Sequence, residues 1–309
     1  MGAQNNMRMN KLGNSDLIVS AVGAGTWAMG GDFFGAIEDK KCIDSLCASL
    51  DHGVNLIDTA PIYGKGHSEQ LVGQAIKGRR DKVVLCTKVG LIFGDPKGRQ
   101  GNCLQADAIE WEIEQSLRRL GTDYIDLLLI HQPAGDYVAG YRLMEKAYKE
   151  GKVRAIGLSN FTKEQIEEIL SICEVKPAVL QTELHPYHQE PELKAFLKKN
   201  GIVSQAWYPL GHGDKALLQE PLFAQLGAKY GKSAPQIILR WHIQSGNIVI
   251  PGSKNPEHIK SNFDLFDFTL TGEEMAQITA FNKNVRYYTS TPEMLKKYAE
   301  MVPPVDEQK

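Results

Sequence analysis

The chain has 309 residues, with 35 basic and 37 acidic side chains, so its formal charge is −2. A charge so close to neutral argues against a surface built mainly to bind nucleic acid or another polyanion. Hydrophobic residues make up 42% and charged residues 23%, which is the composition of a globular protein and excludes disorder, collagen and coiled coil as the dominant state.

The five cysteines follow no regular spacing; they are Cys42, Cys47, Cys86, Cys103 and Cys173. In a chain of this size such a set indicates buried thiols in a reducing compartment, so we expect a cytoplasmic protein. The longest apolar runs, such as residues 127–130, are far shorter than the ~20 residues that a membrane span needs. We therefore expect no part of the chain to lie in a membrane.

The N-terminal region precedes the regular pattern of the chain. Residues 1–8 are polar and lack the apolar core of a signal peptide, so we expect a flexible tail. Residues 10–20 hold a turn-forming cluster, GNSD, between two short extended runs. This arrangement predicts a β-hairpin that closes one end of the fold.

Short apolar runs then alternate with amphipathic stretches. The predicted strands cover residues 21–27, 55–60, 82–89, 125–131, 153–159, 178–183, 202–208 and 247–250. The predicted helices cover residues 40–52, 68–77, 106–120, 141–150, 163–173, 190–200, 222–230, 233–244 and 256–262. Several strands are apolar on both faces, which is typical of parallel sheets covered by helices.

Eight strand–helix units in this length predict an α/β fold, the (β/α)8 TIM barrel. Glycines at positions 53, 121, 151 and 201 stand where helices would end before the next strand. A doubly wound sheet is the alternative, but it would usually carry a glycine-rich dinucleotide fingerprint after its first strand, and the glycines there lack that spacing. We expect one catalytic domain over residues 9–282, and a C-terminal extension over residues 283–309 that either folds near the active face or trails off.

The reactive face of such a barrel lies at the carboxyl ends of its strands, and four polar side chains at or just after these ends are candidate site residues. Asp58 ends the second strand and Tyr63 follows it, while Lys88 ends the third strand and His131 ends the fourth. Asp58 and Lys88 lie on neighbouring strands, and a buried lysine needs a partner, so we expect an ion pair.

The expected ion pair suggests roles for the other two side chains. Its cation would stabilise a nearby phenolate and lower the pKa of Tyr63 from about 10, which makes Tyr63 a candidate general acid. His131 would donate a hydrogen bond to a substrate carbonyl. Each residue alone has a structural explanation, but the four together favour a site.

A metal site is the competing interpretation. Glu183 and His185, together with His131, have side chains of the kind that bind zinc. However, Lys88 would put a positive charge beside the ion, and no second carboxylate follows at ligand spacing, so we expect no metal. We assign packing or surface roles to four other histidines: His52, His67, His212 and His242.

These residues resemble a known family. Residues 55–64, NLIDTAPIYG, are similar to the signature of the aldo-keto reductases, and Lys88 and His131 match the rest of that family's catalytic tetrad. Residues 157–161, GLSNF, and 180–187, LQTELHPY, resemble two further motifs of the family. The resemblance implies reversible NAD(P)H-dependent reduction of an aldehyde or ketone without metal or flavin, with the proton coming from Tyr63.

The resemblance also implies cofactor and substrate contacts. Ser159, Asn160 and Gln181 would hold the nicotinamide carboxamide, and Trp207, next to Tyr208, would stack on the ring. The further cofactor contacts implied are Asp58, Gly25, Thr26, Trp27, Leu210 and Gly211. The substrate contacts implied are Trp27, Phe33, Phe34, Tyr63 and His131.

After the eighth strand the sequence departs from the common pattern of the family. Gly252 and His258 stand where many members have lysine and arginine. We expect the 2′-phosphate of the cofactor near Ser253, Lys254 and His258, at the start of the last predicted helix, and Asn262 as a further cofactor contact. This predicts that NADP(H) is preferred and that NAD(H) remains possible.

Other functions remain open at this point. The chain is either a reductase of a small-molecule carbonyl, a dehydrogenase that mainly oxidises an alcohol or aldose, or a nucleotide-binding regulatory relative that acts through a protein partner. A metal-dependent hydrolase is a weaker alternative. The sequence leaves the substrate undecided among sugars, steroids, diketones and xenobiotic aldehydes, and it also leaves the oligomeric state open.

Overall fold

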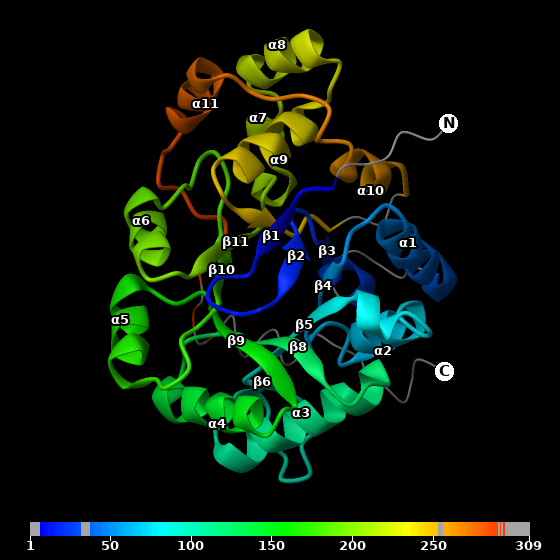
Figure 1. The fold of residues 1–309 in the computed structure, drawn as a ribbon, viewed down its shortest axis with the longest axis vertical. Coiled ribbons are helices and arrows are strands. Elements are labelled where there is room, and N and C mark those ends of the chain that lie inside the picture. The colour runs from blue at the N-terminus through cyan, green and yellow to red at the C-terminus, as the bar shows by residue number, and fades with distance from the viewer. Residues whose placement is uncertain (1–6, 32–37, 253–255, 290, 292, 294–309) are drawn as a thin grey trace.

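The computed structural model describes residues 7–31, 38–252, 256–289, 291 and 293, and Figure 1 shows their arrangement. Within them, eight parallel strands form one sheet in the order β12-β11-β10-β9-β8-β5-β4-β3. Their bounds are β3 Ala24–Gly25, β4 Leu56–Asp58, β5 Val84–Val89, β8 Ile125–Ile130, β9 Val153–Ser159, β10 Val179–Glu183, β11 Val203–Trp207 and β12 Ile248–Val249.

The two edges of this sheet meet. Val22, just before β3, forms a parallel bridge with Val249 of β12, and the Gly23 N–H donates to the Val249 carbonyl at 2.8 Å. The sheet is therefore a closed barrel, with helices in a ring around it (Figure 1). The prediction of a (β/α)8 barrel is confirmed.

All nine predicted helices are present; α3 (Ala106–Leu120) has the predicted bounds and the other eight have shifted ends. They are α1 Asp39–Asp51, α2 His67–Ala75, α3 Ala106–Leu120, α4 Tyr137–Lys149, α5 Lys163–Ile172, α6 Pro191–Lys199, α8 Pro221–Tyr230, α9 Ala234–Gln244 and α10 Pro256–Phe263. The sequence analysis missed α7 Lys215–Leu218, α11 Gly272–Thr279 and the short hairpin of β6 Leu91–Ile92 with β7 Gly101–Asn102. For α11 a signal existed, because Thr271 and Glu274 form a capping box at its start.

The barrel has two apolar layers, one on each side of the sheet. On β8, Leu127 and Leu129 pack in the interior with Leu56, whereas Leu128 and Ile130 pack outward against the helices. Every residue of β8 is buried, which explains its continuous apolar run. Among the described residues, no helix has the length and apolar content that crossing a bilayer requires.

The expectation of five buried thiols is only partly right. Cys42 and Cys86 are buried, but the other three cysteines are half-buried. All five are free thiols. The reason is positional, since Cys86 faces the barrel interior while Cys47 and Cys173 lie at the edges of packed clusters.

The predicted N-terminal hairpin is also present. β1 Met9–Lys11 pairs antiparallel with β2 Ile18–Ser20. Leu12, Leu17 and Val19 are buried in the cluster that fills the barrel interior. The turn reaches the residues just before β10 and β11, so the hairpin covers the amino end of the barrel. Only the carboxyl end of the barrel is left for a site.

The hairpin turn yields a stability prediction. Gly13 has a φ of +55°, and a Cβ there would lie 2.1 Å from the Ala178 carbonyl oxygen. Gly13→Ala should therefore lower the free energy of unfolding by about 2–4 kcal/mol, through left-handed strain plus overpacking. Gly121→Ala is the matched control, because Gly121 has a φ of +64° with nothing within 4 Å. The control should lose about 1 kcal/mol. Equal losses in urea unfolding would show that the turn is not tightly packed.

Candidate active site

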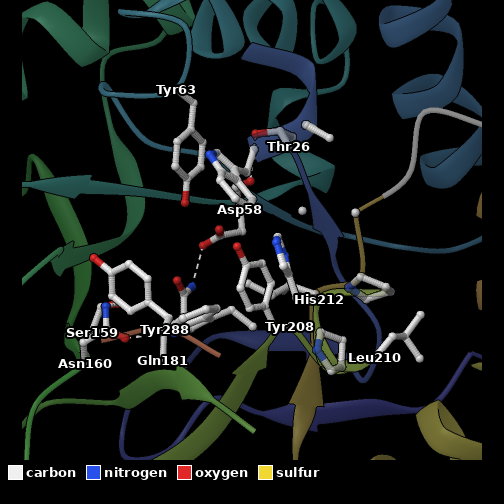
Figure 2. A pocket seen from close by; sticks show the side chains of 18 of the residues that line it. Thr26, Asp58, Tyr63, Ser159, Asn160, Gln181, Tyr208, Leu210, His212 and Tyr288 are labelled. Carbon is white, nitrogen blue, oxygen red and sulfur yellow. Dashed lines mark hydrogen bonds between the residues drawn. The ribbon is translucent and has the colours of Figure 1, made fainter. Parts of the chain in front are cut away.

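A cavity of about 380 Å³ opens at the carboxyl ends of the barrel strands (Figure 2). Many residues nominated from the sequence line it: Gly25, Thr26, Trp27, Asp58, Tyr63, His131, Ser159, Asn160, Gln181, Trp207, Tyr208 and Leu210. They come from different strands, so the closed barrel brings together side chains that are far apart in sequence.

Lys88 lies behind the cavity wall and connects three polar groups. Its Nζ donates to Asp58 Oδ1 at 2.8 Å and to the Thr59 carbonyl at 2.9 Å, and it lies 3.4 Å from Tyr63 Oη. Burial is the largest single influence and alone would lower the pKa of Lys88, but the attraction of Asp58, together with the smaller contributions of Tyr63 and Cys86, outweighs it and raises the pKa above its ordinary value. Lys88 is therefore a buried cation, and the predicted ion pair is present.

The expectation that the pKa of Tyr63 is lowered is wrong, because the pKa is raised. Burial raises the pKa of Tyr63 to about 12, and the nearby Lys88 cation, which lowers it, offsets only part of that effect. The cost of removing a phenolate from water exceeds the attraction of a cation that is already paired with Asp58. At neutral pH the phenol is protonated.

His131 faces Tyr63 edge-on, with ring centroids 5.9 Å apart and planes at 85°. Burial, reinforced by the Lys88 charge, holds the pKa of His131 well below its usual range. Its imidazole is therefore neutral near pH 7, with one N–H to donate and one nitrogen to accept. Tyr63 and His131 together present two hydrogen-bond donors to the cavity.

Three of the residues expected to contact the nicotinamide are already linked to one another or to the ion pair. Gln181 Nε2 donates to Asp58 Oδ2 at 2.7 Å (Figure 2), which leaves the Gln181 carbonyl as an acceptor. Asn160 Nδ2 donates to the His131 carbonyl at 3.2 Å, and Trp207 Nε1 donates to Asn160 Oδ1 at 2.9 Å. The network fixes the orientation of the Trp207 indole at the cavity wall.

The cavity also contains residues that the sequence analysis missed or misjudged. His212 is exposed, as its assignment to a packing or surface role allows, and it packs on Tyr208 with ring centroids 4.3 Å apart, but the sequence analysis did not place it at the cavity, which it lines. His212 has a φ of +55° between two glycines that also have positive φ. Gln132 and Tyr288 line the cavity as well. Gln132 could have been found because it follows His131, but nothing near Tyr288 in the sequence indicates its position.

Other nominated residues lie elsewhere. Gly211 is not among the lining residues and packs under Leu217 and Tyr287. His258 is exposed on α10, and Asn262 is buried beside Gly25. Four nominated residues lie outside the described residues: Phe33, Phe34, Ser253 and Lys254.

Two of the residues considered as metal ligands, Glu183 and His185, bind each other. Glu183 Oε1 and His185 Nε2 are 3.0 Å apart and are hydrogen-bonded. In the described part of the chain, no three His, Cys, Asp or Glu side chains gather as metal ligands.

Comparison with known proteins agrees with this geometry. The model of the Aldo/keto reductase family matches residues 21–283. The chain belongs to the aldo-keto reductase family. It is 40% identical over 260 residues to a glyoxal reductase of Bacillus subtilis, covering 83% of this chain and 89% of the relative. It is 36% identical over 291 residues to a morphine 6-dehydrogenase of Pseudomonas putida, covering 89% and 94%.

Solved structures of aldo-keto reductases share the fold. One from Brucella melitensis has a TM-score of 0.76 and 37% identity, covering 90% of this chain and 100% of that one. The aldo-keto reductase AKR2E5, solved in complex with NADPH, has a TM-score of 0.81 and 29% identity, covering 92% and 90%. This chain is therefore a member of an oxidoreductase family that uses nicotinamide cofactors.

The buried ion pair yields a stability prediction. Lys88→Met should lower the free energy of unfolding by about 3–5 kcal/mol, because it leaves the Asp58 carboxylate buried without its cation. The double variant Asp58→Asn/Lys88→Met should regain part of this loss, since it removes the buried charge. Chemical denaturation at pH 7 measures both. A double variant no more stable than the single one would mean that the loss in Lys88→Met does not come from the unpaired Asp58 carboxylate.

Proposed function

We propose that this chain reduces an aldehyde or ketone to an alcohol, reversibly, with NADP(H) as the preferred cofactor and Tyr63 as the proton donor. One observation carries the proposal. Tyr63 Oη opens on the cavity and lies 3.4 Å from a lysine that is itself held by a buried aspartate at 2.8 Å. The glyoxal reductase and the morphine 6-dehydrogenase among the relatives support the reaction class.

The residues present suit a nicotinamide dinucleotide. Ser159 and Asn160 at the end of β9 and Gln181 beside them in β10 offer hydroxyl and amide groups, and Trp207 offers an aromatic face. When bound, the cofactor supplies the hydride. The chain's own part is to fix the ring, exclude water and control the proton.

Proton control follows from the electrostatics of the cavity. A pKa of about 12 keeps the proton on Tyr63 until a carbonyl oxygen becomes basic. As the proton leaves Tyr63 Oη for that oxygen, the Lys88 cation stabilises the negative charge that remains. Neutral His131 donates its N–H to the same oxygen and so orients the carbonyl.

The proposed preference for NADP(H) rests on the region around α10. Ser253, Lys254 and His258 precede or begin this helix, and a helix amino end favours an anion. A bidentate arginine is absent from positions 253–258, so the grip on a 2′-phosphate is moderate. The relative solved with NADPH is consistent with this choice. The cytoplasmic location and the division at residues 9 and 282 remain predictions from the sequence.

The proton donor is tested by Tyr63→Phe. Loss of the hydroxyl should lower kcat for carbonyl reduction by about 10²–10⁴-fold, the usual contribution of general acid catalysis, while cofactor binding stays nearly unchanged. Steady-state turnover of an aldehyde and quenching of indole fluorescence by NADPH measure the two effects. Tyr137→Phe is the control, because the hydroxyl of Tyr137 bonds Glu168 on the outside of the barrel. A Tyr63→Phe enzyme with more than about a tenth of wild-type kcat would exclude Tyr63 as the acid.

Cofactor choice is tested by Lys254→Ala. Removing one charge-assisted bond to the 2′-phosphate should raise the KM for NADPH by about tenfold to a hundredfold and leave NADH kinetics unchanged. Lys260→Ala removes an exposed lysine from α10 and serves as the matched control. A wild-type enzyme with equal kcat/KM for the two cofactors would refute the preference for NADP(H).

A further inference from the structure

The end of β10 holds a buried carboxylate that the proposed reaction does not use. Glu183 is fully buried. Its Oε1 accepts from the Tyr287 N–H at 2.6 Å and from His185 Nε2 at 3.0 Å, and its Oε2 accepts from the Tyr288 N–H at 3.1 Å. Burial alone would raise the pKa of Glu183, but these donors together lower it, so the carboxylate is charged at neutral pH. Bonds from donors to a buried charge are among the stronger ones in proteins.

Residues 183–187 also bind other parts of a short segment, residues 283–288, which contains Tyr287 and Tyr288 and which we call the C-terminal segment. The Tyr187 carbonyl accepts from the Lys283 N–H at 3.0 Å and from the Val285 N–H at 3.2 Å. The His185 ring packs on the Tyr287 ring with centroids 4.7 Å apart. The motif at residues 183–187 therefore binds a part of the chain about one hundred residues further on.

The C-terminal segment carries two neighbouring aromatic residues, Tyr288 at the cavity and Tyr287 on the loop that follows β11. Tyr288 lines the cavity, its Oη accepts from Gln132 Nε2 at 3.2 Å, and its ring meets Trp207 edge-on at 5.4 Å. The Tyr287 hydroxyl bonds Asp214, and a Cβ added to Gly211 would lie 3.2 Å from the Tyr287 ring. Tyr287 thus packs on the loop that follows β11.

We propose that Glu183 is a positioning residue for carbonyl reduction, acting through the peptide groups of Tyr287 and Tyr288. It holds Tyr288 as the wall that receives the distal part of a substrate, next to Gln132 and Trp207. The substrates that depend on Glu183 are those with an apolar group beyond the reacting carbonyl, such as aromatic aldehydes. This inference rests on the proposed reductase function.

The first test is Glu183→Gln, which keeps the shape of the side chain and removes its charge. The carboxylate accepts hydrogen bonds at both of its oxygens, whereas the glutamine side chain has one oxygen that accepts and one NH2 group that donates. In Glu183→Gln, one of the two peptide N–H groups of Tyr287 and Tyr288 would therefore face an NH2 group and lose its acceptor. The KM for 4-nitrobenzaldehyde should rise about tenfold, the equivalent of one lost charge-assisted bond. The KM for glyoxal, which needs only Tyr63 and His131, should change much less, and kcat should stay near its wild-type value.

Glu145→Gln is the matched control. Glu145 is also buried, and its Oε1 accepts from two consecutive backbone N–H groups, those of Glu174 and Val175, at 2.6 and 2.7 Å. It lies on α4 and binds the loop before the amino end of β10, far from the cavity. Glu145→Gln and Glu183→Gln should both lower thermal stability, but Glu145→Gln should leave both KM values unchanged.

A second measurement needs no turnover. Hydrogen exchange of the Tyr287 and Tyr288 amides should be faster in Glu183→Gln than in the wild type and unchanged in Glu145→Gln. If Glu183→Gln does not fold, Tyr288→Leu replaces it, because it removes the wall itself and should reproduce the selective rise in KM for the aromatic aldehyde.

The outcomes separate this inference from the proposed function. A selective rise in KM with Glu183→Gln or Tyr288→Leu, absent with Glu145→Gln, supports it. Equal KM values in all variants, with turnover intact, would mean that Glu183 only stabilises the fold and would overturn it. A wild-type protein that reduces neither aldehyde would overturn the proposed function and this inference together.

Discussion

The buried ion pair between Asp58 and Lys88 is the interaction on which the site depends. Each charge would be too costly to bury alone, and each removes that cost for the other. Lys88 also donates to the Thr59 carbonyl, and Asp58 also accepts from Gln181 Nε2, so both charged groups have a second hydrogen-bond partner. The pair needs only the neighbouring strands β4 and β5, but Gln181 comes from β10, so the full set of contacts exists only in the curled sheet with the observed strand order.

The barrel also determines where a substrate can enter. The N-terminal hairpin fills the amino end with Leu12, Leu17 and Val19, so the open cavity lies at the carboxyl end, beside the ion pair. The C-terminal segment then adds a wall on that same side, bound to Glu183. The N-terminal hairpin therefore closes the amino end of the barrel, and the C-terminal segment shapes the cavity at the carboxyl end.

Electrostatics could be predicted only in part. The pairing of Asp58 with Lys88 followed from neighbouring strands and from the cost of an isolated buried lysine. The pKa of Tyr63 did not follow, because its sign depends on how much water is removed from the phenol as well as on the distance to Lys88. Burial is a property of the packed barrel, and no local pattern reports it. For a proton donor, the raised pKa is nevertheless compatible with the proposed role.

The strand–helix alternation, the barrel class and the polar residues at the strand ends could be predicted from the sequence, because they depend on local periodicity and on residue order. β9 and α3, for example, have the predicted bounds. The positions of His212 and Tyr288 at the cavity, and the bonds of Glu183 to peptide groups 104 and 105 residues away, are visible in the folded chain alone. Contacts of that kind arise when distant segments pack against one buried surface. The spacing of residues along the chain does not predict them.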